Sequence, residues 1–124
     1  MGSYATKMAL ETYIQANWTQ TSVQWEGEPF STASLSKWIS VKYVGVSNEQ
    51  GFSGRKALNA QLQVFAYTKH PPLSHKLADD ISAMLSCLQL GDIEVRVGQV
   101  QGSALKMDNG FYEVLVTFEV DNYS

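Results

Sequence analysis

Two histidines lie close to acidic residues in this chain and are the first candidates for chemistry. His70 and His75 flank Pro71-Pro72, and Asp79-Asp80 follows them. His75 and Asp79 are four residues apart, so a helix would place both on one face, where they could bind a metal ion. A His–Asp pair at this spacing more often makes a surface contact. Adjacent helical positions point about 100° apart, so Asp79-Asp80 does not form an acid–base couple. We therefore predict no metal and no organic cofactor.

The single cysteine, Cys87, is the candidate thiol nucleophile. If Cys87 and His75 share a helix, the twelve residues between them span about 18 Å, too far for a catalytic dyad. We expect Cys87 to be a buried structural cysteine on or beside the apolar side of that helix. One cysteine also excludes an intramolecular disulfide and a multi-cysteine zinc site. The sequence therefore predicts a protein that is not an enzyme.

A glycine motif could in principle bind RNA. Gly51-Phe52-Ser53-Gly54, followed by Arg55-Lys56, matches the GXXG loop of KH domains. That loop needs a helix on each side to present its backbone to RNA, whereas strand patterns flank it here. The net charge of −3 and the pI near 5.2 also exclude a strongly basic nucleic-acid binder. The motif is better read as a solvated hairpin tip.

Composition indicates one globular domain. The chain has 124 residues, of which 44% are hydrophobic and 17% are charged, enough for a single packed core. No apolar run approaches the roughly 20 residues of a transmembrane helix, and no signal-peptide core follows Met1. Gly2 and Thr6 fit a myristoylation pattern, but no polybasic anchor supports it. We expect no membrane partner.

Hydrophobic periodicity defines the elements that must position any site. Apolar side chains recur at three- and four-residue spacing over residues 4–18 and 73–88, which predicts two amphipathic helices. We expect Ser3 or Thr6 to cap the first helix and Ser74 to cap the second. Strict alternation predicts strands over 38–44, 60–67, 93–97 and 112–120, with a short strand at 22–25. The fold class is α+β: an antiparallel β-sheet of about four main strands with two helices packed on one face.

Two connections stand out among the predicted turns. Residues 45–59 form a polar stretch with two interior glycines, which predicts a hairpin with a long tip that is mobile in the free subunit. Asn109-Gly110 is the strongest hairpin dipeptide in the chain and predicts a tight turn before the last strand.

Several local strings occur in an order that resembles the small tail-terminator proteins of long-tailed bacteriophages, within the wider minor-tail and tail-completion group. The resemblance covers about residues 4–120, with Gly27 standing where the family pattern would have Asn. It rests on the opening helix ending near Trp18, Val23-Gln24-Trp25-Glu26-Gly27-Glu28-Pro29-Phe30, Trp38-Ile39-Ser40-Val41 and Leu77-Ala78-Asp79-Asp80-Ile81.

The resemblance implies a structural virion protein that makes or breaks no bond. Six copies would form a ring that caps the tail tube, stops its growth and receives the head connector, while DNA passes through without sequence-specific binding. The protein would lie in the tail or neck of the virion, after assembly in the host cytoplasm. Trp25, Phe30, Arg55 and Lys56 are the candidate interface residues, although Trp25 and Phe30 fit a core role equally well. Alternatives are another connector or tail-tube subunit, or a small ligand-binding module.

Overall fold

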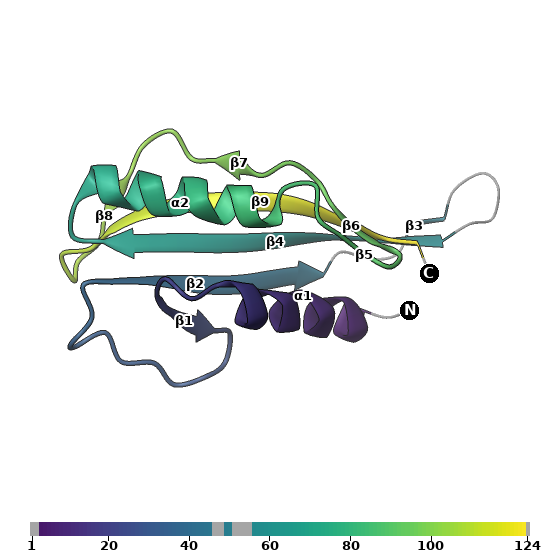
Figure 1. Cartoon of the computed structure of the whole chain (residues 1–124), viewed down its shortest axis with the longest axis horizontal. Coiled ribbons are helices and arrows are strands. Elements are labelled where there is room, and N and C mark those ends of the chain that lie inside the picture. The colour runs from purple at the N-terminus through teal and green to yellow at the C-terminus, as the bar shows by residue number, and fades with distance from the viewer. Residues whose placement is uncertain (1–2, 46–48, 51–55, 124) are drawn as a thin grey trace.

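The computed structural model describes residues 3–45, 49–50 and 56–123 (Figure 1). Two helices alternate with groups of strands along the chain. Their order is α1 (Ser3–Asn17), β1 (Ser22–Trp25), β2 (Lys37–Gly45), β3 (Glu49–Gln50), β4 (Lys56–Thr68), α2 (Pro71–Leu85), β5 (Gln89–Leu90), β6 (Ile93–Val95), β7 (Gln99–Val100), β8 (Leu105–Lys106) and β9 (Tyr112–Asn122).

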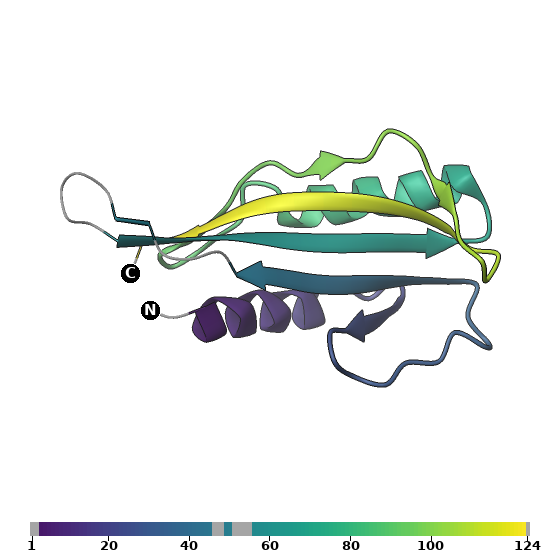
Figure 2. The same ribbon diagram turned by 180° about the vertical axis from the view of Figure 1, so that it is seen from behind.

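The strands form a curled, mixed sheet whose centre is the long pair β4 and β9 (Figure 2). The main path is β1-β2-β4-β9-β6-β5, and β7 and β8 also pair with β9. β1 runs parallel to β2, whereas the other pairings are antiparallel. The short β3 pairs with β4 beside this sheet.

The prediction of about four main antiparallel strands understates this sheet, which has eight strands in the described part of the chain. The additional strands β5, β7 and β8 have two residues each, which is too short for an alternation of apolar and polar residues to be detected in the sequence. The predicted strand at 93–97 ends at Val95. Strand β1 has the predicted bounds, but its parallel pairing with β2 follows from the chain path rather than from its own sequence.

The predicted hairpin of β2 and β4 is confirmed, with a continuous register from Lys37↔Thr68 to Gly45↔Ala60. The expected mobility of its tip falls mainly on residues 46–48 and 51–55, which lie outside the described residues. β4 pairs in turn with β9, from Thr68↔Tyr112 to Leu58↔Asn122. We call these two limits of the β4–β9 ladder the Thr68 end and the Asn122 end. They lie about 34 Å apart at 3.4 Å per residue.

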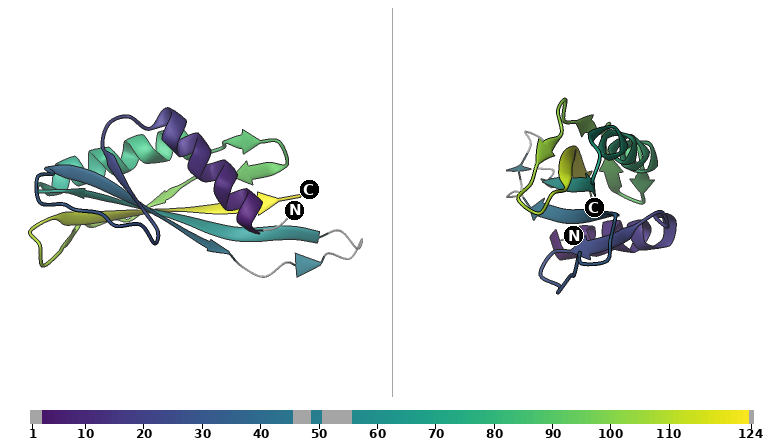
Figure 3. Two further views of the ribbon diagram at one scale, coloured as in Figure 1. Left: turned by 90° about the horizontal axis from the view of Figure 1, so that it is seen from below. Right: turned by 90° about the vertical axis from the view of Figure 1, so that its left-hand side faces the viewer.

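The core lies between the helices and alternate residues of the long strands. It contains Leu10 and Ile14 of α1, Ile81 and Leu85 of α2, and the inward residues of β9, which include the fully buried Phe118. Figure 3 shows the sheet twisting along its length beside the two helices. Neither helix in the described ranges is long and apolar enough to span a membrane.

The second helix differs from its prediction at both ends. It begins at Pro71, because proline fits the first helical turn, where its missing N–H is not needed. Ser74 is therefore inside the helix and buried, and it does not cap it. The helix ends at Leu85, and Cys87 follows with φ +63°. That left-handed turn directs Cys87 to the surface, so the expectation of a buried cysteine was wrong.

The first helix also differs from its prediction. Thr6 is buried within α1 and does not cap it. Its hydroxyl accepts a hydrogen bond of 2.7 Å from Nδ2 of Asn122. This bond ties the start of α1 to the Asn122 end of the ladder, 116 residues away in sequence.

Candidate functional site

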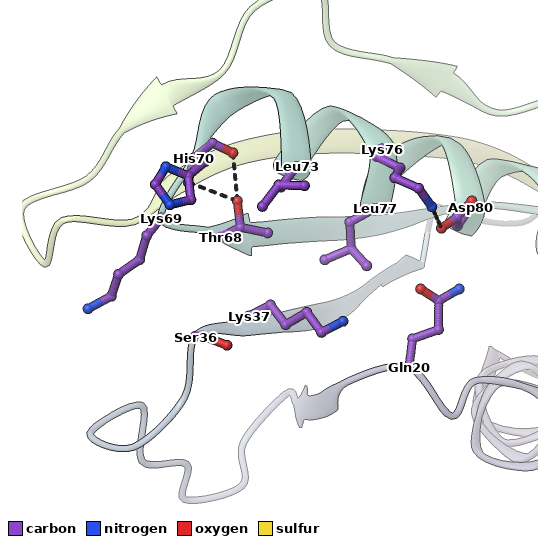
Figure 4. Close-up of a pocket in the computed structure, with 10 residues that line it drawn as sticks. All are labelled: Gln20, Ser36, Lys37, Thr68, Lys69, His70, Leu73, Lys76, Leu77 and Asp80. Carbon is purple, nitrogen blue, oxygen red and sulfur yellow. Dashed lines mark hydrogen bonds and ion pairs between the residues drawn. The ribbon is translucent and has the colours of Figure 1, made fainter.

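A cleft of about 430 Å³ opens at the Thr68 end, between the first turns of α2 and the start of β2 (Figure 4). It is lined by residues from β2, β4, α2 and the segment after α1. They are Gln20, Ser36, Lys37, Thr68, Lys69, His70, Leu73, Lys76, Leu77 and Asp80.

Hydrogen bonds around Thr68 fix the geometry of the cleft. The Thr68 hydroxyl donates to the His70 carbonyl at 2.7 Å and accepts from the His70 amide at 3.1 Å. The Thr68 amide donates to Ser74 Oγ at 3.1 Å, and Ser74 Oγ donates to the Tyr112 carbonyl at 2.7 Å. Because Thr68 and Ser74 are both buried, this network locks the end of β4, the start of α2 and the start of β9 together.

The charge of the cleft is positive. Three lysines line it against one carboxylate, Asp80. Lys76 pairs with Asp80 at 3.2 Å, and its ammonium is still largely exposed. Lys37 extends into the cleft in Figure 4, whereas Lys69 points away from it, with Nζ 5.4 Å from the centre of the Phe111 ring. Lys37 and Lys69 are exposed, which leaves their ammonium groups accessible to an anionic partner.

The cleft also has apolar walls. Two leucines line it: Leu77 is buried, and Leu73 is 51% exposed. A lysine ammonium next to an aliphatic surface suits a carboxylate carried on a partly apolar body, such as an acidic segment of a protein.

The histidines considered for metal binding lie on either side of the start of α2. His70 is its N-cap residue and lines the cleft, and His75 lies one turn into the helix. Among the residues that the structure describes, no group of three or more His, Cys, Asp and Glu side chains is placed to hold a metal ion.

Trp25 and Phe30, two of the four residues predicted to form an interface, contact other residues of the chain, and Trp25 lies far from a third, Lys56. Trp25 is half-buried against the core, and Phe30 packs on Trp38 with 5.2 Å between ring centres. Trp25 registers with Val41, which registers with Val64, so Lys56 lies eight residues further along β4, about 27 Å away. Arg55 lies outside the described residues, and the side chain of Lys56 is not described.

Sequence reasoning missed the lysines of the cleft, although one signal pointed to them. Lys37 immediately precedes the predicted strand at 38–44, and Lys69 follows the predicted strand at 60–67 by two residues. In an antiparallel hairpin the start of the first strand meets the end of the second, so these lysines had to share one end of the sheet. Lys76 and Asp80 joined them only because α2 begins directly after β4.

Comparisons with known proteins bear on the fold. No protein-family model matches the chain, and no curated protein matches it. A solved structure whose name states no function is similar to this chain, with a TM-score of 0.69 and 16% sequence identity. The match covers 98% of this chain and 96% of the other. At this identity the likeness shows that the two chains share a fold.

Proposed function

We propose that this protein is a ring-forming tail terminator of a long-tailed bacteriophage, which caps the tail tube, stops its elongation and provides the docking surface for the head connector. The sequence strings that resemble this family suggest the role. The structural observation that supports it most is the position of the exposed large apolar side chains. Among the described residues six of the eight, all except Val44 and Val97, lie at the two opposite ends of the β4–β9 ladder.

Three of these side chains belong to the Thr68 end. Leu73 is 51% exposed on the first turn of α2, and Leu105 is 51% exposed on β8, where it registers with Glu113. Met107 follows in the turn before β9. Exposed apolar side chains grouped at one end of a domain are typical of a surface that a neighbouring molecule covers.

Three more belong to the Asn122 end. Tyr4 is 75% exposed and Met8 is also exposed, close to the hydrogen bond that joins α1 to Asn122. Tyr123 is exposed directly after β9. A groove of about 440 Å³ lies beside them, with Met8, Tyr13 and Leu90 in its lining. Its walls are almost entirely apolar.

A cyclic ring requires two different surfaces on each subunit, because each copy contacts the next head to tail. The two apolar surfaces fit this requirement, since they differ in residues and lie at opposite ends. The architecture that we propose also keeps both helices on one apolar face of the sheet, supported by the core cluster that α1 and α2 share. The edge strand β1 then remains available to the tube or the connector.

A small ligand-binding module is the second candidate, and the lysine-lined cleft favours it. Its volume of about 430 Å³ falls within the range of small-molecule sites, roughly 300–1,000 Å³. Seven of the ten lining residues are solvent-exposed, including all three lysines. Small-molecule sites bury most of the ligand surface, so this exposed lining suits a subunit contact better.

Electron microscopy of the purified protein, alone and mixed with purified tail tubes, tests the proposal. We expect discrete rings of one size, with a ring seated at one end of each tube and no tube growth. Filaments that lengthen with added protein would contradict it and favour a tube subunit. Single particles that neither form rings nor attach to tubes would favour the ligand-binding module.

A further inference from the structure

We infer that the lysine-lined cleft at the Thr68 end binds the acidic surface at the Asn122 end of a second copy of this chain, so that charge sets the direction of the ring contact. This inference rests on the proposed function, because it takes the neighbouring molecule to be another copy in the ring. It goes further by naming the two surfaces and the polarity of their contact.

The acidic surface is built by β6 and β9. Glu94 registers directly opposite Asp121, and Glu119 lies two residues before Asp121, so the three carboxylates share one face of the sheet. Asp92 lies beside them in the turn before β6, and its carbonyl accepts a hydrogen bond from the Tyr123 amide at 3.1 Å. Asp92, Glu94 and Glu119 are exposed.

One arginine partly compensates this surface. Arg96 Nη2 lies 2.9 Å from Asp121 Oδ2, and Arg96 Nε donates to the same oxygen at 3.0 Å. Asp121 is buried, so the pair ties the residue that follows β6 to β9 and neutralises this carboxylate. The other three carboxylates remain at the surface and give it a net negative charge.

The two surfaces are complementary in charge and similar in their surroundings. The cleft carries three lysines against one aspartate, and the facing surface of the next copy would carry three exposed carboxylates. Each lies next to exposed apolar side chains, Leu73 in the cleft and Tyr123 beside the acidic strands. Apolar contact supplies adhesion, whereas opposite charges steer the encounter and fix which end meets which.

The alternative contacts are disfavoured by the same charges. Two clefts brought together would oppose lysines, and two Asn122 ends would oppose carboxylates. Only the head-to-tail arrangement pairs opposite charges, and in the ring that we propose this contact repeats around the rotation axis. A second copy thus satisfies both surfaces at once, which an unrelated acidic protein would not.

Charge-swapped variants test this contact. The first variant is Lys37→Glu with Lys76→Glu, and the second is Glu94→Lys with Glu119→Lys. Sedimentation velocity should show that each variant alone self-associates with a Kd at least about 100-fold higher than the wild type. Mixed in equal amounts, the two should assemble again, because every contact in an alternating ring then pairs opposite charges.

The matched control is Lys42→Glu with Asp79→Lys, which changes exposed charges in the middle of β2 and of α2. It should assemble like the wild type. All substituted residues are exposed, and thermal unfolding of each variant confirms that it is folded. Assembly of both swapped variants alone, or failure of the mixture to assemble, would overturn the inference.

The result also separates the inference from the proposed function. If swapped variants still form rings in the electron microscope, the charge contact is refuted and the terminator role stands. A wild-type chain that stays monomeric at about 1 mM would equally refute a contact between free copies. Capping of tail tubes would then still decide the proposed function.

Discussion

Aromatic residues join the strands on the side of the sheet opposite the core. Tyr67 of β4 stacks on Trp38 of β2, with 4.0 Å between ring centres. Its hydroxyl donates to Glu113 of β9 at 2.7 Å, so one side chain ties three strands together. Burial raises the pKa of the Tyr67 phenol well above its usual value of 10, and the hydrogen bond to Glu113 raises it further.

This shift predicts a pH dependence of stability. Above pH 10 the unfolded chain releases the Tyr67 proton whereas the folded chain keeps it, so the free energy of unfolding falls as pH rises. From pH 10 to pH 11 this group should lower that free energy by about 1 kcal/mol. Tyr67→Phe removes the effect, and urea unfolding of both proteins at several pH values measures it. A difference between the two proteins that stays constant with pH would contradict the assignment.

At the scale of elements, the long alternating segments were predictable and the connections between them were not. β9 and β4 have enough alternating residues to specify both strand and face, and Asn109-Gly110 forms the expected turn, with Gly110 at φ +86°. The two-residue strands have no period to detect. The end of α2 was misplaced because the apolar spacing continues to Leu88, although the helix ends at Leu85.

The candidate site, like the short connections, could not be predicted from local sequence patterns. The lysines of the cleft come from β2, the β4–α2 connection and α2, so only the paired register brings them together. Trp25 and Phe30 were chosen because they lie in a segment that resembles the tail-terminator family. Such a resemblance does not indicate whether an aromatic side chain is exposed to solvent. Both are half-buried by contacts within the chain.

The segment between β6 and β7 packs so closely on β9 that it requires glycine. A Cβ at Gly98 would lie 2.5 Å from Cε2 of Phe118, which is fully buried and cannot move aside. We expect Gly98→Ala to lower the free energy of unfolding by about 1–3 kcal/mol. Gly102→Ala is the control, because a Cβ there meets no atom within 4 Å. If the Gly98→Ala and Gly102→Ala variants have equal free energies of unfolding in chemical denaturation, Gly98 does not lie as close to the Phe118 ring as described.

The network at the Thr68 end gives a second test at this scale. Ser74→Ala removes the acceptor of the Thr68 amide and the donor to the Tyr112 carbonyl, all in a buried setting. We expect a loss of about 1–3 kcal/mol of stability. Ser82→Ala, which removes only a half-buried contact with Ser86, should cost less than about 1 kcal/mol. If thermal melts do not separate the two variants, the network does not anchor α2.

At the scale of the whole molecule, the chain is an elongated domain whose two ends differ. The Thr68 end carries the lysine-lined cleft with exposed leucines, and the Asn122 end carries exposed carboxylates with exposed tyrosines. In the assembly that we propose, the two different ends of such a subunit make repeated head-to-tail contacts. This is the form that a terminator requires, because it must bind its ring-mates and a tube end without stacking on itself.

Deleting the gene for this chain from a phage genome that carries it tests the proposed terminator role most directly. Electron microscopy of the resulting lysates should show heads without joined tails, together with tails of uncontrolled length. Restoring the wild-type chain should return tails to one length and join them to heads. Lysates that contain no tails at all would contradict the account, because that outcome identifies a tube subunit rather than the protein that stops the tube.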